Sequence, residues 1–336
     1  MPEQTEKLLT YAEAVNRALR RKLEEDETTL LFGEDVGIPG GVFGVTKGLT
    51  KRFGNRVFDT PISESAILGG AIGAALVGRR PIVEIMWADF TLVALDQIVN
   101  QAANVRYVSK GHLNAPLTIR TQQGSGPGAC AQHSQNLEAL FAHIPGLIVA
   151  MPATAQDAHD LLLSAIESDD PVIVIENRNL YHGPKQSVKL DGPVEPIGGA
   201  VVRRAGHDIT VVTWGAIQGR VIEAADILEG EGISTEVIDM RWMRPLDIEA
   251  VLASVSRTGH LMVVHEAHEF GGLGAEVVAS VVESGVPLRQ SPVRMGTPAV
   301  RIPAAPSLLN AVIPSAVRIV ERVKSILEPS LQTVTR

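Results

Sequence analysis

Glu64 is the residue whose position first suggests chemistry, because it stands between a short apolar run and a long Ala/Gly-rich segment. The run Arg56–Phe58 predicts a strand that stops before Pro61, and we expect a helix to begin at the glutamate. Ligands of α/β sheets bind beyond the carboxyl ends of the strands, so this carboxylate stands where such sites form. The structural alternative is a first-turn glutamate that stabilises its own helix dipole.

Two further residues occupy equivalent positions after other predicted strands. His133 lies in the glycine-rich loop 121–134, where an imidazole can titrate near neutrality and reach a ligand. Phe90 follows the predicted strand Pro81–Met86. Taken singly, such a histidine is usually structural or solvated, and such a phenylalanine usually belongs to a core. Glu64, Phe90 and His133 each follow one of three successive strands of the same predicted parallel sheet. Their positions therefore predict one shared site.

Two other patterns carry weaker signals. The segment Gly126–Ala131 matches the dinucleotide pattern G-x-G-x-x-A, but five residues separate it from the preceding strand and the next strand brings no acid for a ribose. The segment His265-Glu-Ala-His268-Glu269 gathers two imidazoles and two carboxylates after the predicted strand Leu261–Val264. Its spacing is not H-E-x-x-H, so we expect a position at a domain interface or site rim and assign no metal.

The composition bounds the class of protein. The chain of 336 residues suits two domains, and 45% hydrophobic with 20% charged residues predicts a globular protein. A net charge of -8 argues against nucleic acid and anionic membranes as partners. The single Cys130 and the lack of an apolar run of about 18 residues predict a cytoplasmic protein without a membrane span.

Short apolar runs alternate with helical segments along the chain, which is typical of parallel sheets covered on both faces. The capping-box spacing after Thr10 predicts a first helix from Tyr11, and residues 91–108 predict another. The predicted fold class is α/β, with two three-layer domains and mostly parallel sheets. We expect the domains at 1–185 and 201–336, joined by a Pro/Gly-rich linker at 186–200. The other predicted elements are strands Thr28–Phe32, Leu117–Arg120, Leu147–Met151, Pro171–Ile175, Ile209–Thr213 and Thr235–Ile238, and helices 155–167, 217–229, 248–255 and 316–327.

A set of segments in a fixed order resembles a known family. The segments are Gly33-Glu-Asp-Val, Phe58-Asp-Thr-Pro-Ile-Ser-Glu64, Asp96-Gln-Ile-Val-Asn-Gln-Ala-Ala, Ala131-Gln-His133-Ser-Gln, Ile144-Pro-Gly-Leu, Asp170-Pro-Val-Ile and Arg241-x-x-x-Pro-Leu-Asp247. With these segments the chain is similar, over nearly its whole length, to the beta subunit of the thiamine diphosphate-dependent first component of 2-oxo acid dehydrogenase complexes. This resemblance implies a pyrimidine-binding domain followed by a transketolase C-terminal-like domain.

The resemblance assigns roles to five residues. Glu64 would bond a ring nitrogen of the aminopyrimidine and favour the imino tautomer, which takes the proton from the thiazolium carbon. Phe90 would stack on the pyrimidine, with Ile62 nearby. His133 would lie near the reacting carbon and move a proton or stabilise charge. Glu34 would belong to an acidic tunnel between paired active sites.

The resemblance also implies partners. The chain lacks the Gly-Asp-Gly signature that holds magnesium and the diphosphate. The resemblance therefore implies that an alpha subunit supplies this half of the cofactor site in an α2β2 heterotetramer. A lipoyl-bearing acyltransferase core would receive the acyl group. Potassium is possible near 117–120 and 165–170, as in relatives, although Ser168 and Asp170 replace the commoner residues. The chain alone should bind thiamine diphosphate poorly.

The expected activity is oxidative decarboxylation of a 2-oxo acid, with pyruvate as the default. The segment Gly40–Leu49 also resembles acetoin dehydrogenases, whereas His265-Glu-Ala is more like pyruvate and branched-chain members. A split transketolase-type subunit, which moves ketol groups between sugars, is a further alternative. A non-catalytic assembly module with a vestigial glutamate is the last.

Overall fold

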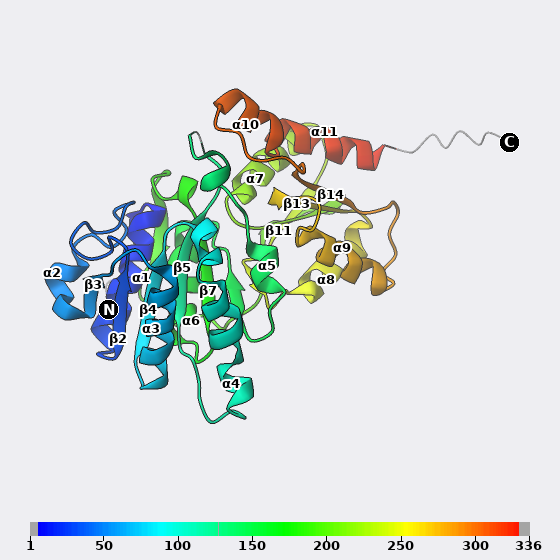
Figure 1. Cartoon of the computed structure of the whole chain (residues 1–336). Coiled ribbons are helices and arrows are strands. Elements are labelled where there is room, and N and C mark those ends of the chain that lie inside the picture. Colours follow the sequence, from blue (N-terminus) through cyan, green and yellow to red (C-terminus); the bar gives the residue numbers. More distant parts are fainter. Residues whose placement is uncertain (1–5, 127, 329–336) are drawn as a thin grey trace, which may run out of the picture. The chain divides into compact units, whose positions relative to one another are not determined.

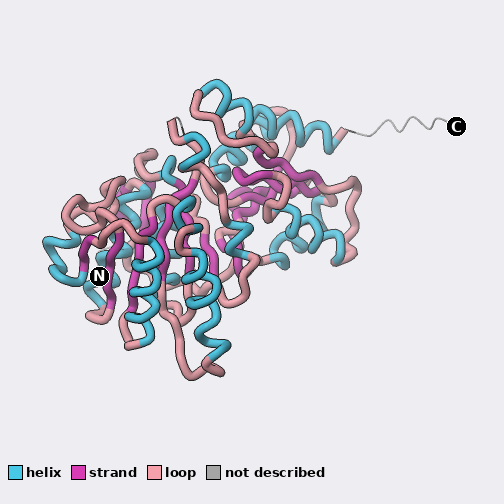
Figure 2. The backbone as a smooth tube through the Cα atoms, in the orientation of Figure 1, coloured by secondary structure: helices cyan, strands magenta, loops and turns pink. Residues whose placement is uncertain are grey.

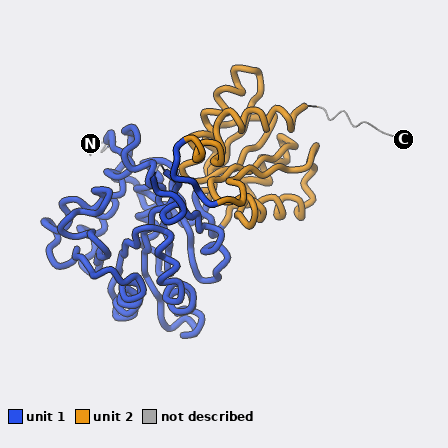
Figure 3. Tube along the Cα trace, turned by 45° about the horizontal axis from the view of Figure 1, so that its top comes forward, with its two compact units in different colours: residues 1–198, 241–245, 301–306 blue, residues 199–240, 246–300, 307–336 orange. Residues whose placement is uncertain are grey.

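The computed structural model describes residues 6–126 and 128–328. The chain divides into two compact units, coloured separately in Figure 3. Unit 1 comprises Met1–Gly198, Arg241–Pro245 and Arg301–Pro306, and unit 2 comprises Gly199–Met240, Leu246–Val300 and Ser307–Arg336. The chain therefore passes between the units more than once, a feature that the predicted division into two consecutive segments does not include.

Unit 1 is built on a seven-stranded sheet with the order β12-β6-β7-β5-β4-β2-β3. Figure 1 labels β2, β3, β4, β5 and β7 of this sheet. Every pair in it is parallel except β12 with β6. The sheet strands are β2 (Thr29–Gly33), β3 (Val57–Asp59), β4 (Arg80–Ile85), β5 (Thr118–Gln123), β6 (Ile148–Ala150), β7 (Val172–Asn177) and β12 (Trp242–Arg244). The α-helices of unit 1 are α1 (Tyr11–Glu25), α2 (Leu49–Phe53), α3 (Glu64–Leu76), α4 (Val105–Val108), α5 (Glu138–Ala142) and α6 (Ala155–Glu167).

Helices cover both faces of this sheet. In Figure 2 the strands are magenta and the helices that flank them are cyan. Leu31 of β2 packs into the core formed with α1 and α6, whereas its neighbours Leu30 and Phe32 face α3. This alternation follows from the period of two along a strand. The helix α1 begins with the predicted capping box, in which Thr10 and Glu13 bond each other's backbone amides.

Unit 2 has a five-stranded sheet of order β14-β13-β10-β11-β9, parallel except for β9 with β11. The predicted α/β class with mostly parallel sheets is thus confirmed in both units. The strands are β9 (Val201–Arg204), β10 (Ile209–Thr213), β11 (Thr235–Asp239), β13 (Leu261–His268) and β14 (Val293–Thr297). The helices are α7 (Ile217–Gly230), α8 (Ile248–Thr258), α9 (Gly274–Glu283), α10 (Pro306–Val312) and α11 (Ala316–Leu327).

The predicted helix 91–108 is wrong as a continuous element. The segment consists of 3₁₀ turns at Ala88–Leu92 and Ala102–Asn104, a π-helical turn at Gln97–Gln101 and the short α4. The side chain of Asn104 donates to backbone carbonyls of the preceding turn. Such side-chain bonds to the backbone compete with the regular helical ladder.

Two other elements differ from expectation. Within the predicted linker, β8 (Gln186–Lys189) pairs antiparallel with β1 (Glu6–Leu9) as a separate two-stranded sheet. The strand β13 continues to His268 instead of ending at Val264. Within this extension the pairing with β14 is irregular between Val264 and His268, and His265 is buried whereas His268 is exposed. The two imidazoles therefore lie in different environments.

Candidate functional site

Four adjacent strands of unit 1 end beside one another and carry the predicted site residues. The sheet order places β5, β4, β2 and β3 side by side, with Gly33 of β2 paired to Asp59 of β3 and to Glu84 of β4. Glu34 follows β2 directly, and Glu64 begins α3 after β3. The structure therefore brings two carboxylates together at the carboxyl edge of the sheet.

The two carboxylates are buried and influence each other. Glu34 and Glu64 are each 8% exposed. Burial raises the pKa of Glu34, and the nearby charges of Glu64 and Asp35 raise it further. Among the described residues, Oε1 of Glu34 has no hydrogen-bond partner, and the Glu64 side chain accepts no hydrogen bond. These groups are thus available to a polar ligand.

The loops around the carboxylates are tied to neighbouring strand ends. The carboxylate of Asp59 accepts hydrogen bonds from the amides of Gly37 and Ile38 at 2.6 and 3.0 Å. Ser65 Oγ donates to the carbonyl of Val93 at 2.7 Å. The first contact fixes the loop after β2, and the second joins the start of α3 to the segment after β4.

His133 lies among aromatic rings at the end of β5. Its imidazole is stacked on the indole of Trp87, with ring centroids 5.1 Å apart and an interplanar angle of 22°. Phe90 meets the same imidazole edge-on at 5.6 Å and 73°. His133 Nδ1 is buried without a hydrogen-bond partner in the described part of the chain. The predicted pair Phe90 and His133 is therefore in direct contact.

The glycine-rich loop before His133 packs closely against the end of β7. A Cβ at Gly124 would lie 2.6 Å from the Asn177 side chain, and one at Gly126 would lie 2.6 Å from Arg178 Nη2. Asn179 Nδ2 also donates to the carbonyl of Ser125 at 2.7 Å. These glycines permit a close approach of chain to chain, so the dinucleotide pattern is not needed to explain them. Residue 127 of that pattern lies outside the described residues.

Apolar surface surrounds the carboxylate end of α3. Ile62 is 81% exposed and does not touch the ring cluster of His133 in any described contact, while Phe58 and Val93 are also exposed. A cavity of ≈ 380 Å³ lies between α3 and the strands β2 and β3. A helix that is apolar on several sides is normally buried, so this surface suits another polypeptide.

Sequence reasoning missed Trp87 and Arg178, which lie beside the predicted residues. The guanidinium carbon of Arg178 is 4.8 Å from the indole centroid of Trp87.

A buried ionic cluster in the middle of the sheet was also not predicted from the sequence. In it, Arg120 bonds both Glu84 and Glu176. Burial raises the pKa of Glu84, although the Arg120 charge opposes this. Charged residues inside predicted apolar strands were the available signal.

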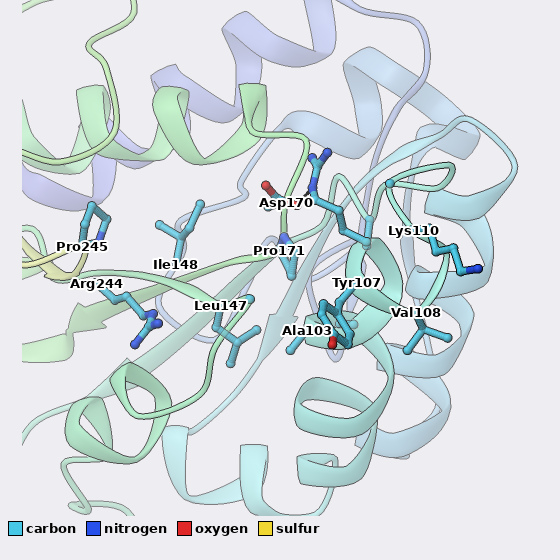
Figure 4. A pocket seen from close by; sticks show the side chains of 15 residues that line it. Ala103, Tyr107, Val108, Lys110, Leu147, Ile148, Asp170, Pro171, Arg244 and Pro245 are labelled. Carbon is cyan, nitrogen blue, oxygen red and sulfur yellow. Dashed lines mark hydrogen bonds and ion pairs between the residues drawn. The ribbon is translucent and has the colours of Figure 1, made fainter.

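Another cavity of unit 1 lies at the opposite edge of the sheet. Its volume is ≈ 920 Å³, and its wall includes Ala115, Leu147 and Pro171, which precede β5, β6 and β7 (Figure 4). None of the predicted site residues lines it. Arg106 Nε lies 2.5 Å from Asp170 Oδ1 at its margin, so this charge pair is already satisfied.

Other predicted features take structural positions. His265 is fully buried, and His268 Nδ1 lies 2.9 Å from the carbonyl of Pro298. Within residues 6–126 and 128–328, no cluster of three or more His, Cys, Asp or Glu side chains is arranged for a metal ion. In the same part of the chain, no helix has the length and apolar character needed to cross a membrane.

The chain matches two known domain families and several characterised sequences. Residues 7–184 match "Transketolase, pyrimidine binding domain" and residues 198–319 match "Transketolase, C-terminal domain". It is 41% identical to the pyruvate dehydrogenase E1 component subunit beta of Staphylococcus epidermidis, over 95% of this chain and 99% of the relative. The corresponding subunit of Acholeplasma laidlawii is 44% identical over 89% of this chain and 92% of the relative.

A solved structure supports the same fold. The chain resembles a protein described as "Split gene transketolase, inactive beta4 tetramer", with a TM-score of 0.80 and 27% sequence identity. The match covers 95% of this chain and 98% of that chain. The similarity therefore extends over both units and does not depend on one motif.

Proposed function

The chain belongs to the family of pyruvate dehydrogenase E1 component beta subunits, and its pyrimidine-binding domain implies that it binds thiamine diphosphate. From this membership we propose that the chain, with an alpha subunit, decarboxylates a 2-oxo acid oxidatively and passes the acyl group to lipoyl groups of an acyltransferase core. Pyruvate is the proposed substrate. The observation that carries the proposal is the common strand edge at which Glu34, Glu64, Phe90 and His133 lie.

Glu64 is the proposed proton-controlling residue. Its carboxylate is buried, stands at the start of α3 and accepts no hydrogen bond from the other described residues, so it fits a ring nitrogen of an aminopyrimidine. When bound, thiamine diphosphate supplies the electron sink that decarboxylation needs. Glu64 holds the proton at the ring nitrogen, and apolar neighbours strengthen that bond by excluding water.

The other site residues have complementary roles in this proposal. Phe90 offers an aromatic face for the pyrimidine, and Ile62 adds an exposed apolar side chain at the rim. His133 moves a proton or stabilises developing charge near the substrate. Glu34, whose pKa is raised by burial and by the nearby charge of Glu64, is the proposed member of an acidic tunnel between paired active sites.

A partner chain completes the site. Membership among beta subunits implies an alpha subunit within the complex, and we propose a cytoplasmic α2β2 assembly in which the alpha chain holds magnesium and the diphosphate. The exposed apolar side chains of Ile62 and Val93 beside the carboxylates support this arrangement. The solved relative is described as an inactive tetramer of beta chains, which agrees with a half-site that needs a different partner.

A potassium ion fits the described residues poorly. The guanidinium of Arg80 donates through Nη1 to the carbonyl oxygens of residues 166–168 at 2.9 to 3.3 Å. The carboxylate of Asp170 is paired with Arg106. Arginine side chains already supply positive charge to these oxygens. We therefore propose that Arg80, in place of a potassium ion, stabilises the carbonyl groups at the end of α6.

The alternatives differ in the donor substrate. Acetoin or a branched-chain 2-oxo acid would use the same Glu64, and the split transketolase type has support from the solved relative. The higher identity to pyruvate dehydrogenase subunits favours the leading proposal. A non-catalytic assembly module would not depend on Glu64 at all.

Reconstitution tests the proposal directly. The chain is co-expressed with its alpha subunit, and reduction of an artificial acceptor is measured with pyruvate, acetoin, a branched-chain 2-oxo acid and a ketose phosphate. We expect pyruvate to be preferred and Glu64→Gln to lower turnover by at least about 100-fold. Glu283→Gln, an exposed change in α9, is the matched control and should leave turnover unchanged. Full activity of the Glu64→Gln complex would exclude the proposed proton role.

A further inference from the structure

The orientation of the His133 ring has an unusual physical basis in this chain. A catalytic imidazole is commonly oriented by a hydrogen bond to its second ring nitrogen. Nδ1 of His133 is buried, yet it has no such partner among the described residues. The contacts that the structure does provide are aromatic, namely a stacked Trp87 and an edge-on Phe90.

The two aromatic contacts are not equivalent. Trp87 is nearly parallel to the imidazole at 22°, so it restricts rotation of the ring about its side-chain bonds and covers one face from water. Phe90 meets the imidazole at 73°, which leaves the faces of its own ring available for another partner. Stacking by Trp87 is therefore the contact that best defines the plane of the imidazole.

Trp87 is itself supported by residues that no sequence pattern indicated. Arg178 lies with its guanidinium carbon 4.8 Å from the indole centroid, and Phe43 meets the indole edge-on at 5.1 Å. Arg178 also packs against Gly126, where a Cβ would lie 2.6 Å from Nη2. The same guanidinium thus contacts both the indole and the loop that carries His133.

We propose that Trp87 is a positioning residue that sets the plane of the His133 imidazole, with Arg178 supporting the indole. This inference rests on the proposed function, because Trp87 influences turnover only if His133 acts in the reaction. Trp87 touches neither substrate nor cofactor in this account. Its contribution is to keep His133 in one orientation before the partner chain and substrate arrive.

A double-mutant cycle tests this role in the reconstituted complex. Trp87→Leu should lower turnover roughly 10- to 100-fold, as a small misplacement of a reacting group does, while Trp87→Phe keeps a stacking ring and most of the activity. In a His133→Gln background, Trp87→Leu should cost less than about 2-fold, because the residue it positions is absent. Tyr107→Leu, at the opposite edge of the sheet, is the aromatic control.

Two results in this cycle would overturn the inference. One is an equal loss from Trp87→Leu with and without the His133 imidazole, which indicates a general structural role. The other is a Trp87→Phe complex as impaired as Trp87→Leu, since a phenyl ring can still stack.

A second readout does not depend on catalysis. In the full-length chain with isotope-labelled histidine, the His133 ring signal is assigned by its loss in His133→Gln. The stacked indole should displace this signal upfield, and Trp87→Leu should remove the displacement. An unchanged signal would refute the stack itself. Failure of the wild-type complex to turn over any 2-oxo acid, with the displacement intact, would instead count against the proposed function.

Discussion

The two units each contain a tryptophan stacked on a histidine, and the surroundings of the two pairs differ. Trp87 and His133 in unit 1 are 5.1 Å apart, and Trp214 and His265 in unit 2 are 5.2 Å apart with an interplanar angle of 13°. His133 is partly exposed and lies on a loop beside Phe90. His265 is 0% exposed and lies inside strand β13.

Glycines explain why His265 cannot serve a ligand. Added Cβ atoms at Gly272, Gly274 and Gly296 would lie 2.7 to 2.9 Å from its ring, so backbone fills the space around it. Burial lowers the pKa of His265 to about 4, although a hydrogen bond to the carbonyl of Ala267 opposes this. The same pair geometry therefore serves packing in unit 2 and, in our proposal, catalysis in unit 1.

The largest expected difference concerns turnover. His133→Gln should lower turnover of the reconstituted complex by at least about 100-fold with little change in melting temperature, because the side chain is partly exposed. His265→Gln should lower stability and leave turnover of the folded complex unchanged. Steady-state rates and thermal melts of both variants make the comparison. Similar rate losses in both would remove the distinction between the two stacks.

Removing the buried tryptophan tests the packing role in unit 2. Trp214 is 2% exposed, so Trp214→Ala should cost about 3–5 kcal/mol of unfolding free energy through lost contacts and a cavity. Urea unfolding, monitored through hydrogen exchange of the β13 amides, measures this cost. A loss below about 1 kcal/mol would show that the surrounding backbone closes around the gap.

Acid should destabilise unit 2 through His265. Its folded pKa of about 4 lies below the ordinary value of 6.5, so this contribution is fully present above pH 6.5 and is lost as the pH falls toward 4. The difference corresponds to about 3 kcal/mol. Unfolding free energies between pH 7 and 4 should show this slope in the wild type and lose it in His265→Gln. An unchanged slope in the variant would assign the acid sensitivity to other groups.

The smallest expected effect comes from single methyl groups. Gly274→Ala places a Cβ 2.8 Å from the His265 ring and should cost roughly 1–3 kcal/mol by overpacking. Gly219→Ala in α7 meets nothing within 4 Å and should instead stabilise by roughly 0.5–1 kcal/mol. Equilibrium unfolding of the two variants measures both values. The same sign for both would contradict a tightly filled cage around His265.

Local patterns were sufficient for much of the fold. The helix α6 occupies residues 155–167 as predicted, and α3 begins at Glu64, because caps and apolar periodicity act over a few residues. Strand alternation also indicated which residues would follow parallel strands. The positions of Glu64, Phe90 and His133 at one sheet edge could therefore be predicted.

Features that depend on distant contacts could not be read from the chain. Trp87 and His133 are 46 residues apart, and their stack depends on how β4 and β5 pair and on the path of the intervening loops. The strand β12 joins the sheet of unit 1 although it lies beyond the predicted linker. The extension of β13 through His268 likewise depends on pairing with β14.

Cofactor titration shows whether the carboxyl edge of unit 1 is one half of a binding site that another chain completes. Thiamine diphosphate with magnesium is titrated calorimetrically into this chain alone, into the alpha subunit alone and into their mixture. We expect weak binding to each chain alone and tight binding, one cofactor per pair of chains, to the mixture. Saturation of this chain by itself, together with turnover of pyruvate, would contradict this expectation.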